Sequence, residues 1–200
     1  MPGINRDLHG MATDKSPVAL LLLDLINDLD FPEADQLLPF AIPMAHRLAG
    51  LRVRARETGI PVVYVNDNYG KWRSDFKAHV DHCISDETKG AEIARLLKPN
   101  DDDYFVLKPK HSGFFSTTLE VLLDHLEART LIITGMAGNI CVLFTANDAY
   151  MRDYKVVVPC DCVASNPVEE NNYALRQIES VLKGDIRSSD QVDLARLTEG

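Results

Sequence analysis

The sequence predicts an α/β protein with three layers, in which helices cover both faces of a mostly parallel, six-stranded sheet. Three observations predict this fold. Aliphatic runs alternate with amphipathic, helix-like segments along the chain. The run VALLLLDL at 18–25 is continuous rather than alternating, as expected for a central strand that is buried on both faces. No repeat, low-complexity segment or Pro/Gly/Ser-rich linker divides the chain.

The elements follow from these runs and from the turn signals between them. After the run at 18–25, strands are predicted at 61–66, 104–108, 130–134 and 155–163, with a short sixth strand near 185–188. Helices are predicted at 34–58, 75–83, 91–97, 118–128, 139–152 and 167–182. Pro39 and Pro43 are expected to bend or divide the start of the first helix. Cys160 and Cys162 alternate in the fifth strand and are expected to be buried small hydrophobes.

Length and composition indicate a single globular domain. Two hundred residues with 46% apolar side chains suit one domain with one substantial core. Residues 1–16 are polar and lack an apolar central region, so we expect a flexible N-terminal arm there and a single domain over 17–200. Four cysteines in such a chain make no disulfide scaffold, and reduced thiols are expected.

Charge and hydrophobicity argue against nucleic acid and membrane as partners. The net charge is −9 and no basic stripe appears, which argues against a nucleic-acid surface. The most apolar run is too short to span a bilayer and contains an aspartate. We therefore expect a cytoplasmic protein that acts on a small molecule.

Three polar residues stand at or just beyond the carboxyl ends of predicted strands. They are Asp24 after the first strand, Lys108 at the end of the third and Cys141 beyond the fourth. In open α/β sheets, ligands bind at this edge, where the strand order reverses. With the Rossmann-like order 3-2-1-4-5-6, the reversal places Asp24 and Cys141 across one crevice.

The three residue types together suit nucleophilic catalysis. Cys141 lies in the first turn of its helix, where free N–H groups and the helix dipole would lower the thiol pKa from its usual value of about 8.5. Lys108 would favour the thiolate further, and Asp24 could accept the thiol proton. Each residue alone has an ordinary alternative, as a packed cysteine, a capping aspartate or a solvated lysine. Together they supply a nucleophile, a proton acceptor and a cation.

Three segments carry a resemblance to a known family. They are LLLLDLINDL at 20–29, LKPKHSGFFSTTLEVLL at 107–123 and LIITGMAGNICVLFTANDAYMRDYKVVVPCDCVAS at 131–165. They resemble the signature regions of the isochorismatase-like cysteine hydrolases, which include nicotinamidases, N-carbamoylsarcosine amidases and ureidoacrylate amidohydrolases. The resemblance covers about 18–182 and is most specific in the last segment.

The resemblance implies the roles of several residues. The family's Asp-Lys-Cys triad falls on Asp24, Lys108 and Cys141, and Lys108 fits better than Lys110 because the family's lysine stands four residues before a serine. A non-proline cis peptide is implied at Met136–Ala137, and an oxyanion hole at the amides of Ala137 and Cys141. The resemblance also implies a homo-oligomer.

The loop after the second strand departs from the nicotinamidase pattern. Nicotinamidases hold a divalent metal there with Asp-x-His and a further histidine, but this chain reads NDNYGKWRSDF at 66–76, with Tyr69 at the histidine position. A lone carboxylate holds a transition metal poorly, so we expect no metal and no cofactor.

A substrate wall is the alternative use of this region. Asn66, Asn68, Tyr69 and Trp72 could form an aromatic, hydrogen-bonding wall, although an ordinary loop explains them equally well. His111 could contact the substrate or be an ordinary loop histidine.

The predicted function is hydrolysis of a C–N bond in a small amide or in a carbamoyl- or ureido-type substrate, through an acyl-enzyme on Cys141. Two alternatives stay open. One is a non-catalytic or thiol-redox protein on the same fold. The other is a Rossmann-like nucleotide-binding module, disfavoured because no G-x-G-x-x-G follows the first strand.

Overall fold

A parallel sheet forms the centre of the molecule. In the computed structural model, residues 15–68, 75–85 and 87–199 are described. The strands are β1 (Val18–Leu23), β2 (Val62–Asp67), β3 (Tyr104–Lys108), β4 (Thr130–Met136), β5 (Lys155–Val157) and β6 (Val163–Ala164). Their order is β3-β2-β1-β4-β5, with β6 also paired to β4, and the paired strands are parallel. The predicted fold class and the order of the first five strands are confirmed.

The far edge of the sheet differs from the prediction. The expected fifth strand is split into β5 and β6 by a 3₁₀ turn at Cys160–Cys162, which follows Pro159. A proline has no N–H for a sheet ladder, so the strand breaks there. The expected sixth strand is reduced to one parallel bridge between Val157 and Asp185. The prediction that both cysteines are buried on a strand is wrong, because Cys162 is buried while Cys160 is exposed in the turn.

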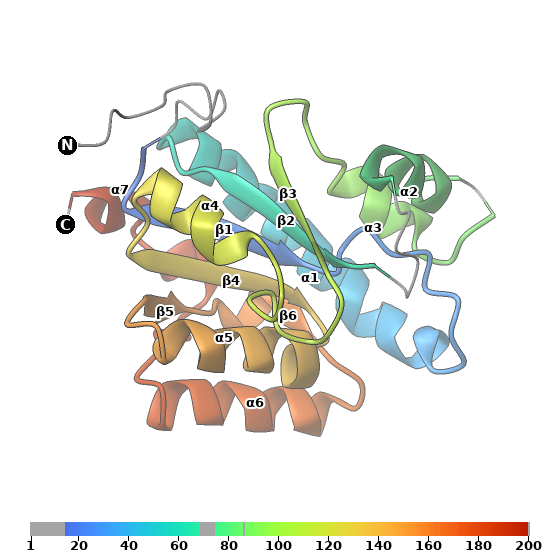
Figure 1. Cartoon of the computed structure of the whole chain (residues 1–200). Coiled ribbons are helices and arrows are strands. Elements are labelled where there is room, and N and C mark those ends of the chain that lie inside the picture. The colour runs from blue at the N-terminus through green and yellow to red at the C-terminus, as the bar shows by residue number, and fades with distance from the viewer. Residues whose placement is uncertain (1–14, 69–74, 86, 200) are drawn as a thin grey trace.

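The helices cover both faces of the sheet. They are α1 (Ala34–Glu57), α2 (Phe76–Cys83), α3 (Ala91–Leu96), α4 (Leu119–Leu126), α5 (Leu143–Tyr150), α6 (Val168–Ser180) and α7 (Leu194–Thr198). In Figure 1, α1 passes behind the sheet while α4 and α5 lie in front of it. The short α7 was not predicted.

Two helices depart from their predicted form. Helix α1 runs unbroken through Pro39 and Pro43, because its buried face, which includes Leu37, Ala41 and Leu48, is held against the sheet. The predicted helix at 139–152 begins instead as a π-helical turn over Gly138–Val142 and continues as α5.

The buried strand β1 divides the core into two layers. Val18, Leu20 and Leu22 belong to the cluster that includes α1, α2 and α3. Ala19, Leu21 and Leu23 belong to the cluster that includes α4, α5 and α6. All six strand residues are fully buried, which explains the continuous aliphatic run in the sequence.

Two further expectations concern the N-terminal arm and the absence of a membrane-spanning segment. Residues 1–14 of the predicted arm lie outside the described residues. Among the helices that are described, none combines the length and the apolar character needed to cross a membrane.

Candidate active site

Asp24 turns the chain at the carboxyl end of β1. Its backbone has φ +54°, a left-handed conformation that aspartate tolerates better than most residues. Its carboxylate is buried and accepts a hydrogen bond from the backbone N–H of Asp67, with Oδ1 2.7 Å from that nitrogen. The other oxygen, Oδ2, lies 2.8 Å from the ammonium of Lys108. Both oxygens of the Asp24 carboxylate are therefore held by partners on the neighbouring strands β2 and β3.

Lys108 is the centre of the cluster. Its side chain has no exposed surface, which is rare for lysine unless it is paired. The ammonium donates to the thiol of Cys141, with Nζ 3.4 Å from Sγ, and lies 3.6 Å from the carboxylate of Asp67. Asp67 and Lys108 are register partners on β2 and β3, so the sheet itself sets their separation. The structure therefore brings Asp24, Lys108 and Cys141 together, as the strand-end rule predicts.

Cys141 lies in the π-helical turn at Gly138–Val142, directly after β4. Single π turns inside helices are frequent at functional sites. The peptide between Met136 and Ala137 is cis, at the position that the family resemblance implies. The thiol is partly exposed and hydrogen-bonds to Asp24 as well as to Lys108.

Gly135 allows β4 to approach β1 closely at this edge. Its φ is +115°, and a Cβ added there would lie 2.1 Å from the carbonyl oxygen of Leu23, the residue before Asp24. Only glycine fits both the backbone conformation and the contact. This close approach sets the nucleophile turn beside Asp24.

The pKa values of Asp24 and Lys108 reflect a balance between burial and the charges of their neighbours. Burial raises the pKa of Asp24 above its usual range, against the opposing effects of the Lys108 ammonium and of hydrogen bonds from Cys141 and the Asp67 amide. Burial also lowers the pKa of Lys108, but Asp24, Cys141 and Asp67 outweigh that effect and leave it raised. The Lys108 side chain is therefore protonated and positively charged at neutral pH.

The prediction of a lowered pKa for the Cys141 thiol is contradicted. Burial and the Asp24 carboxylate raise the pKa of Cys141 to about 12, although Lys108 acts in the opposite direction. The sequence pattern showed the helix start and the cation, but not the desolvation of the thiol. At neutral pH the resting thiol keeps its proton, so its reaction requires a proton acceptor. Asp24 contacts the thiol and can take this role.

The residues predicted to form a substrate wall are partly buried and partly outside the described residues. Asn66 has no exposed surface, and its amide nitrogen donates to the carbonyl of Ile26 at 2.7 Å. It therefore bonds to the chain after β1 and has no exposed surface with which to form the wall that we expected. Asn68 is buried and its backbone N–H donates to Lys108 O at 3.0 Å. Tyr69 and Trp72 lie outside the described residues.

His111 remains a candidate for substrate contact. It is exposed in the loop after β3, and its ring centroid lies 5.5 Å from that of Phe144 on α5. Phe144 is itself 52% exposed, so the two rings form an accessible aromatic surface near the start of α5.

Sequence reasoning missed the contacts that fasten the loop after Lys108 to the helix after Cys141. Ser112 donates to the carboxylate of Asp148, and the N–H of Gly113 donates to Thr145 Oγ1 at 2.9 Å. The LKPKHSG segment and α5 are distant in sequence, so no local pattern reveals these bonds. Asp67, in the NDNYGKWRSDF segment, was considered only as one position of the nicotinamidase metal pattern, although it stands at a strand end like Asp24.

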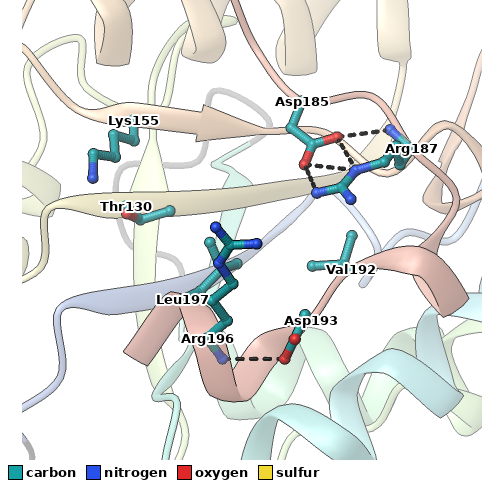
Figure 2. Close-up of a pocket in the computed structure, with 8 residues that line it drawn as sticks. All are labelled: Thr130, Lys155, Asp185, Arg187, Val192, Asp193, Arg196 and Leu197. Carbon is teal, nitrogen blue, oxygen red and sulfur yellow. Dashed lines mark hydrogen bonds and ion pairs between the residues drawn. The ribbon is translucent and has the colours of Figure 1, made fainter. Parts of the chain in front are cut away.

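The described residues hold no group of three or more histidine, cysteine, aspartate or glutamate side chains placed to bind a metal. A pocket of about 450 Å³ lies away from this cluster, at the amino ends of β4 and β5, where Thr130 and Lys155 begin these strands (Figure 2). Arg187 is engaged there by Asp185, and the eight residues drawn include neither cysteine nor histidine. The reactive side chains are concentrated at the opposite edge of the sheet.

Comparison with known proteins agrees with this geometry. The sequence profile of the isochorismatase domain matches residues 18–190. The chain is 43% identical over 178 residues to the isochorismatase family protein YaaI of Bacillus subtilis, covering 89% of this chain and 97% of YaaI. It is 39% identical over 162 residues to the ureidoacrylate amidohydrolase RutB of Methylorubrum extorquens, covering 69% of this chain and 64% of RutB.

Solved structures share the fold. The crystal structure of N-carbamoylsarcosine amidase from Thermoplasma acidophilum superimposes with a TM-score of 0.69 at 25% sequence identity, covering 88% of this chain and 98% of that one.

Proposed function

Because the chain belongs to the isochorismatase family of hydrolases, we propose that it hydrolyses a C–N bond in a small amide or ureido compound through a covalent intermediate on Cys141. The contact that carries the proposal is the thiol of Cys141, set against Asp24 and 3.4 Å from the buried ammonium of Lys108. The amidohydrolase and amidase names of similar proteins support a C–N bond as the target.

In the first half of the reaction, Cys141 Sγ attacks the substrate carbonyl carbon while Asp24 takes the thiol proton. The carbonyl oxygen becomes an oxyanion, which the amides of Ala137 and Cys141 would stabilise. The C–N bond then breaks as Asp24 gives its proton to the leaving nitrogen. The products of this half are an amine and an acyl-thioester.

In the second half, Asp24 takes a proton from water as the water oxygen attacks the thioester carbonyl. The carbon–sulfur bond breaks, a carboxylic or carbamic acid leaves, and the proton returns to the thiol. Lys108 stays charged throughout, because three anionic or polar partners surround it. Its charge stabilises the thiolate as it forms and fixes the carboxylate beside it.

We propose that this chemistry needs no metal. The carboxylate of Asp67, at the position of a nicotinamidase ligand, lies 3.6 Å from the Lys108 ammonium. A divalent cation on that carboxylate would face the buried positive charge at close range, which is unfavourable.

The redox alternative is less well supported. Thiol–disulfide chemistry requires a second sulfur in reach of the first. The described partners of the Cys141 thiol are an acid and an ammonium, and all four cysteines are free.

A screen for ammonia or amine release tests the proposal. Wild-type protein and Cys141→Ala are incubated with primary amides, ureido acids and carbamoyl compounds. We expect at least one substrate to be hydrolysed by the wild type only. Equal turnover by Cys141→Ala on every substrate found would refute the role of the thiol.

A further inference from the structure

Two buried polar side chains lie behind the turn that carries Cys141. Ser165 follows β6 and is 1% exposed, and Asn171 lies in the first turn of α6 and is 7% exposed. Ser165 Oγ accepts a hydrogen bond from the backbone N–H of Asn139 at 3.0 Å and donates to Asn171 Oδ1 at 3.1 Å. This chain of hydrogen bonds ends on a backbone amide two residues before the thiol.

Gly138 brings the backbone of the turn directly onto this pair. A Cβ added at Gly138 would lie 2.1 Å from Asn171 Oδ1 and 3.0 Å from Ser165 Oγ. The pair is therefore in close contact with the turn and also bonded to it. Even a methyl group at this position would push the turn away from Ser165 and Asn171.

The hydrogen bonds determine which amides of the turn are occupied. Asn139 N–H donates to Ser165, and those of Ile140 and Val142 both donate to the carbonyl of Ala137, at 3.1 and 3.2 Å. None of these is one of the two amides proposed for the oxyanion hole. Removing the Ser165 hydroxyl would leave the Asn139 N–H without this acceptor, and the turn would lose its bond to the β6–α6 segment.

We propose that Ser165 and Asn171 are positioning residues for the reaction, which hold the Cys141 turn in place through the Asn139 amide. The inference rests on the proposed function. The turn carries both the nucleophile and an oxyanion donor, so a shift of the turn misplaces two groups at once. Such a shift acts on the transition state more than on substrate binding, because the reacting geometry is fixed to fractions of an ångström.

Ser165→Ala tests the proposal against a matched control. Ser189 is similarly buried, at 6% exposure, and its hydroxyl donates to Asp161 Oδ2 at 2.8 Å. Ser189→Ala therefore removes a comparable hydrogen bond of a buried serine outside the Cys141 turn. We expect Ser165→Ala to lower kcat by about 10- to 100-fold with KM within about threefold, and Ser189→Ala to leave both unchanged.

Two further variants separate positioning from folding. Ser165→Thr keeps the hydroxyl and should restore most of the turnover. If melting curves show that Ser165→Thr does not fold, Asn171→Ala serves as a second test: it removes the acceptor of the Ser165 hydroxyl while Ser165 itself stays in place, and it should lower kcat in the same way as Ser165→Ala. Turnover equal to wild type in both Ser165→Ala and Asn171→Ala overturns the proposal.

A second readout needs no substrate. The rate at which iodoacetamide labels Cys141 is followed at pH 8 by peptide mass spectrometry. A turn displaced from Asp24 should expose the thiol and relieve it of the neighbouring carboxylate, so labelling should speed up several-fold in Ser165→Ala and not in Ser189→Ala. Unchanged labelling in Ser165→Ala overturns the proposal. If Cys141→Ala still hydrolyses substrate, the proposed function fails while the labelling result still decides the role of Ser165.

Discussion

Replacing Lys108 with Met removes the buried ammonium and keeps most of the side-chain volume. The ammonium lies 2.8 Å from Asp24 Oδ2 and 3.6 Å from Asp67 Oδ2, and its side chain is fully buried. Removing one partner of such a pair typically costs about 3–5 kcal/mol, because the other charge is left buried. Asp24 keeps the hydrogen bond from the Asp67 amide at 2.7 Å, so we expect a loss near the lower end, about 3 kcal/mol at pH 8.

The pH dependence of this loss has a definite sign. Lys108 lowers the pKa of Asp24, so the variant has a higher Asp24 pKa than the wild type. The ion pair stabilises the fold while Asp24 is charged, and its contribution disappears as the pH falls through the Asp24 pKa. Between the wild-type pKa and the higher pKa of the variant, the stability difference should therefore shrink by about 1.4 kcal/mol per pH unit as the pH falls.

Urea unfolding from pH 8 to pH 5 measures this difference, with Lys110→Met as the matched control on an exposed lysine nearby. We also expect Lys108→Met to lose at least about 100-fold in kcat/KM, and Lys110→Met to lose little. The reasoning is refuted if Lys108→Met is within about 0.5 kcal/mol of Lys110→Met at pH 8, or if the difference grows as the pH falls.

Asp24→Asn should slow hydrolysis by about 100-fold or more, because the proton acceptor is lost, and should speed iodoacetamide labelling of Cys141 at pH 8, because the carboxylate that raises its pKa is gone; slower labelling would contradict this. Gly135→Ala should cost more than about 2 kcal/mol in urea unfolding, since its Cβ would lie 2.1 Å from Leu23 O, whereas Gly50→Ala, with nothing within 4 Å, should not be destabilising. The acid limb of kcat/KM should have a midpoint above about 3.9, because burial raises the pKa of Asp24; a midpoint below that value would show that another group controls the limb. Turnover should survive exhaustive chelation, and activity that is lost with EDTA and restored by a divalent metal would show that a metal is required.

The fold was predictable because its signals are local. The unbroken aliphatic run of β1 reports burial on both faces, and the regular spacing of helices and strands reports a parallel sheet. Asp24, Lys108 and Cys141 could be found for the same reason, since each stands at or just after a strand end. The break of the fifth strand at Pro159 was missed because the apolar run continues through it.

What the sequence could not show are balances between opposing effects and contacts between distant segments. The pKa of Cys141 depends on burial and Asp24 acting against Lys108, and only the positions of these groups decide the direction. The bond from Asn139 N–H to Ser165 joins residues 26 positions apart, and no periodic pattern marks it. The burial of Asn66 could not be predicted either, because a polar residue at a strand end can face the core as well as the site.

The central claim is that Cys141 forms a covalent acyl-enzyme, and the mass of the protein during turnover tests it most directly. A substrate found in the screen is mixed with the enzyme, quenched in acid within the first turnovers, and the protein is analysed intact and after digestion. We predict an added mass equal to the acyl group, located on the peptide that contains Cys141 and absent from Cys141→Ala. Rapid hydrolysis with no adduct on Cys141, by an enzyme whose Cys141→Ala variant still turns over, would contradict the claim.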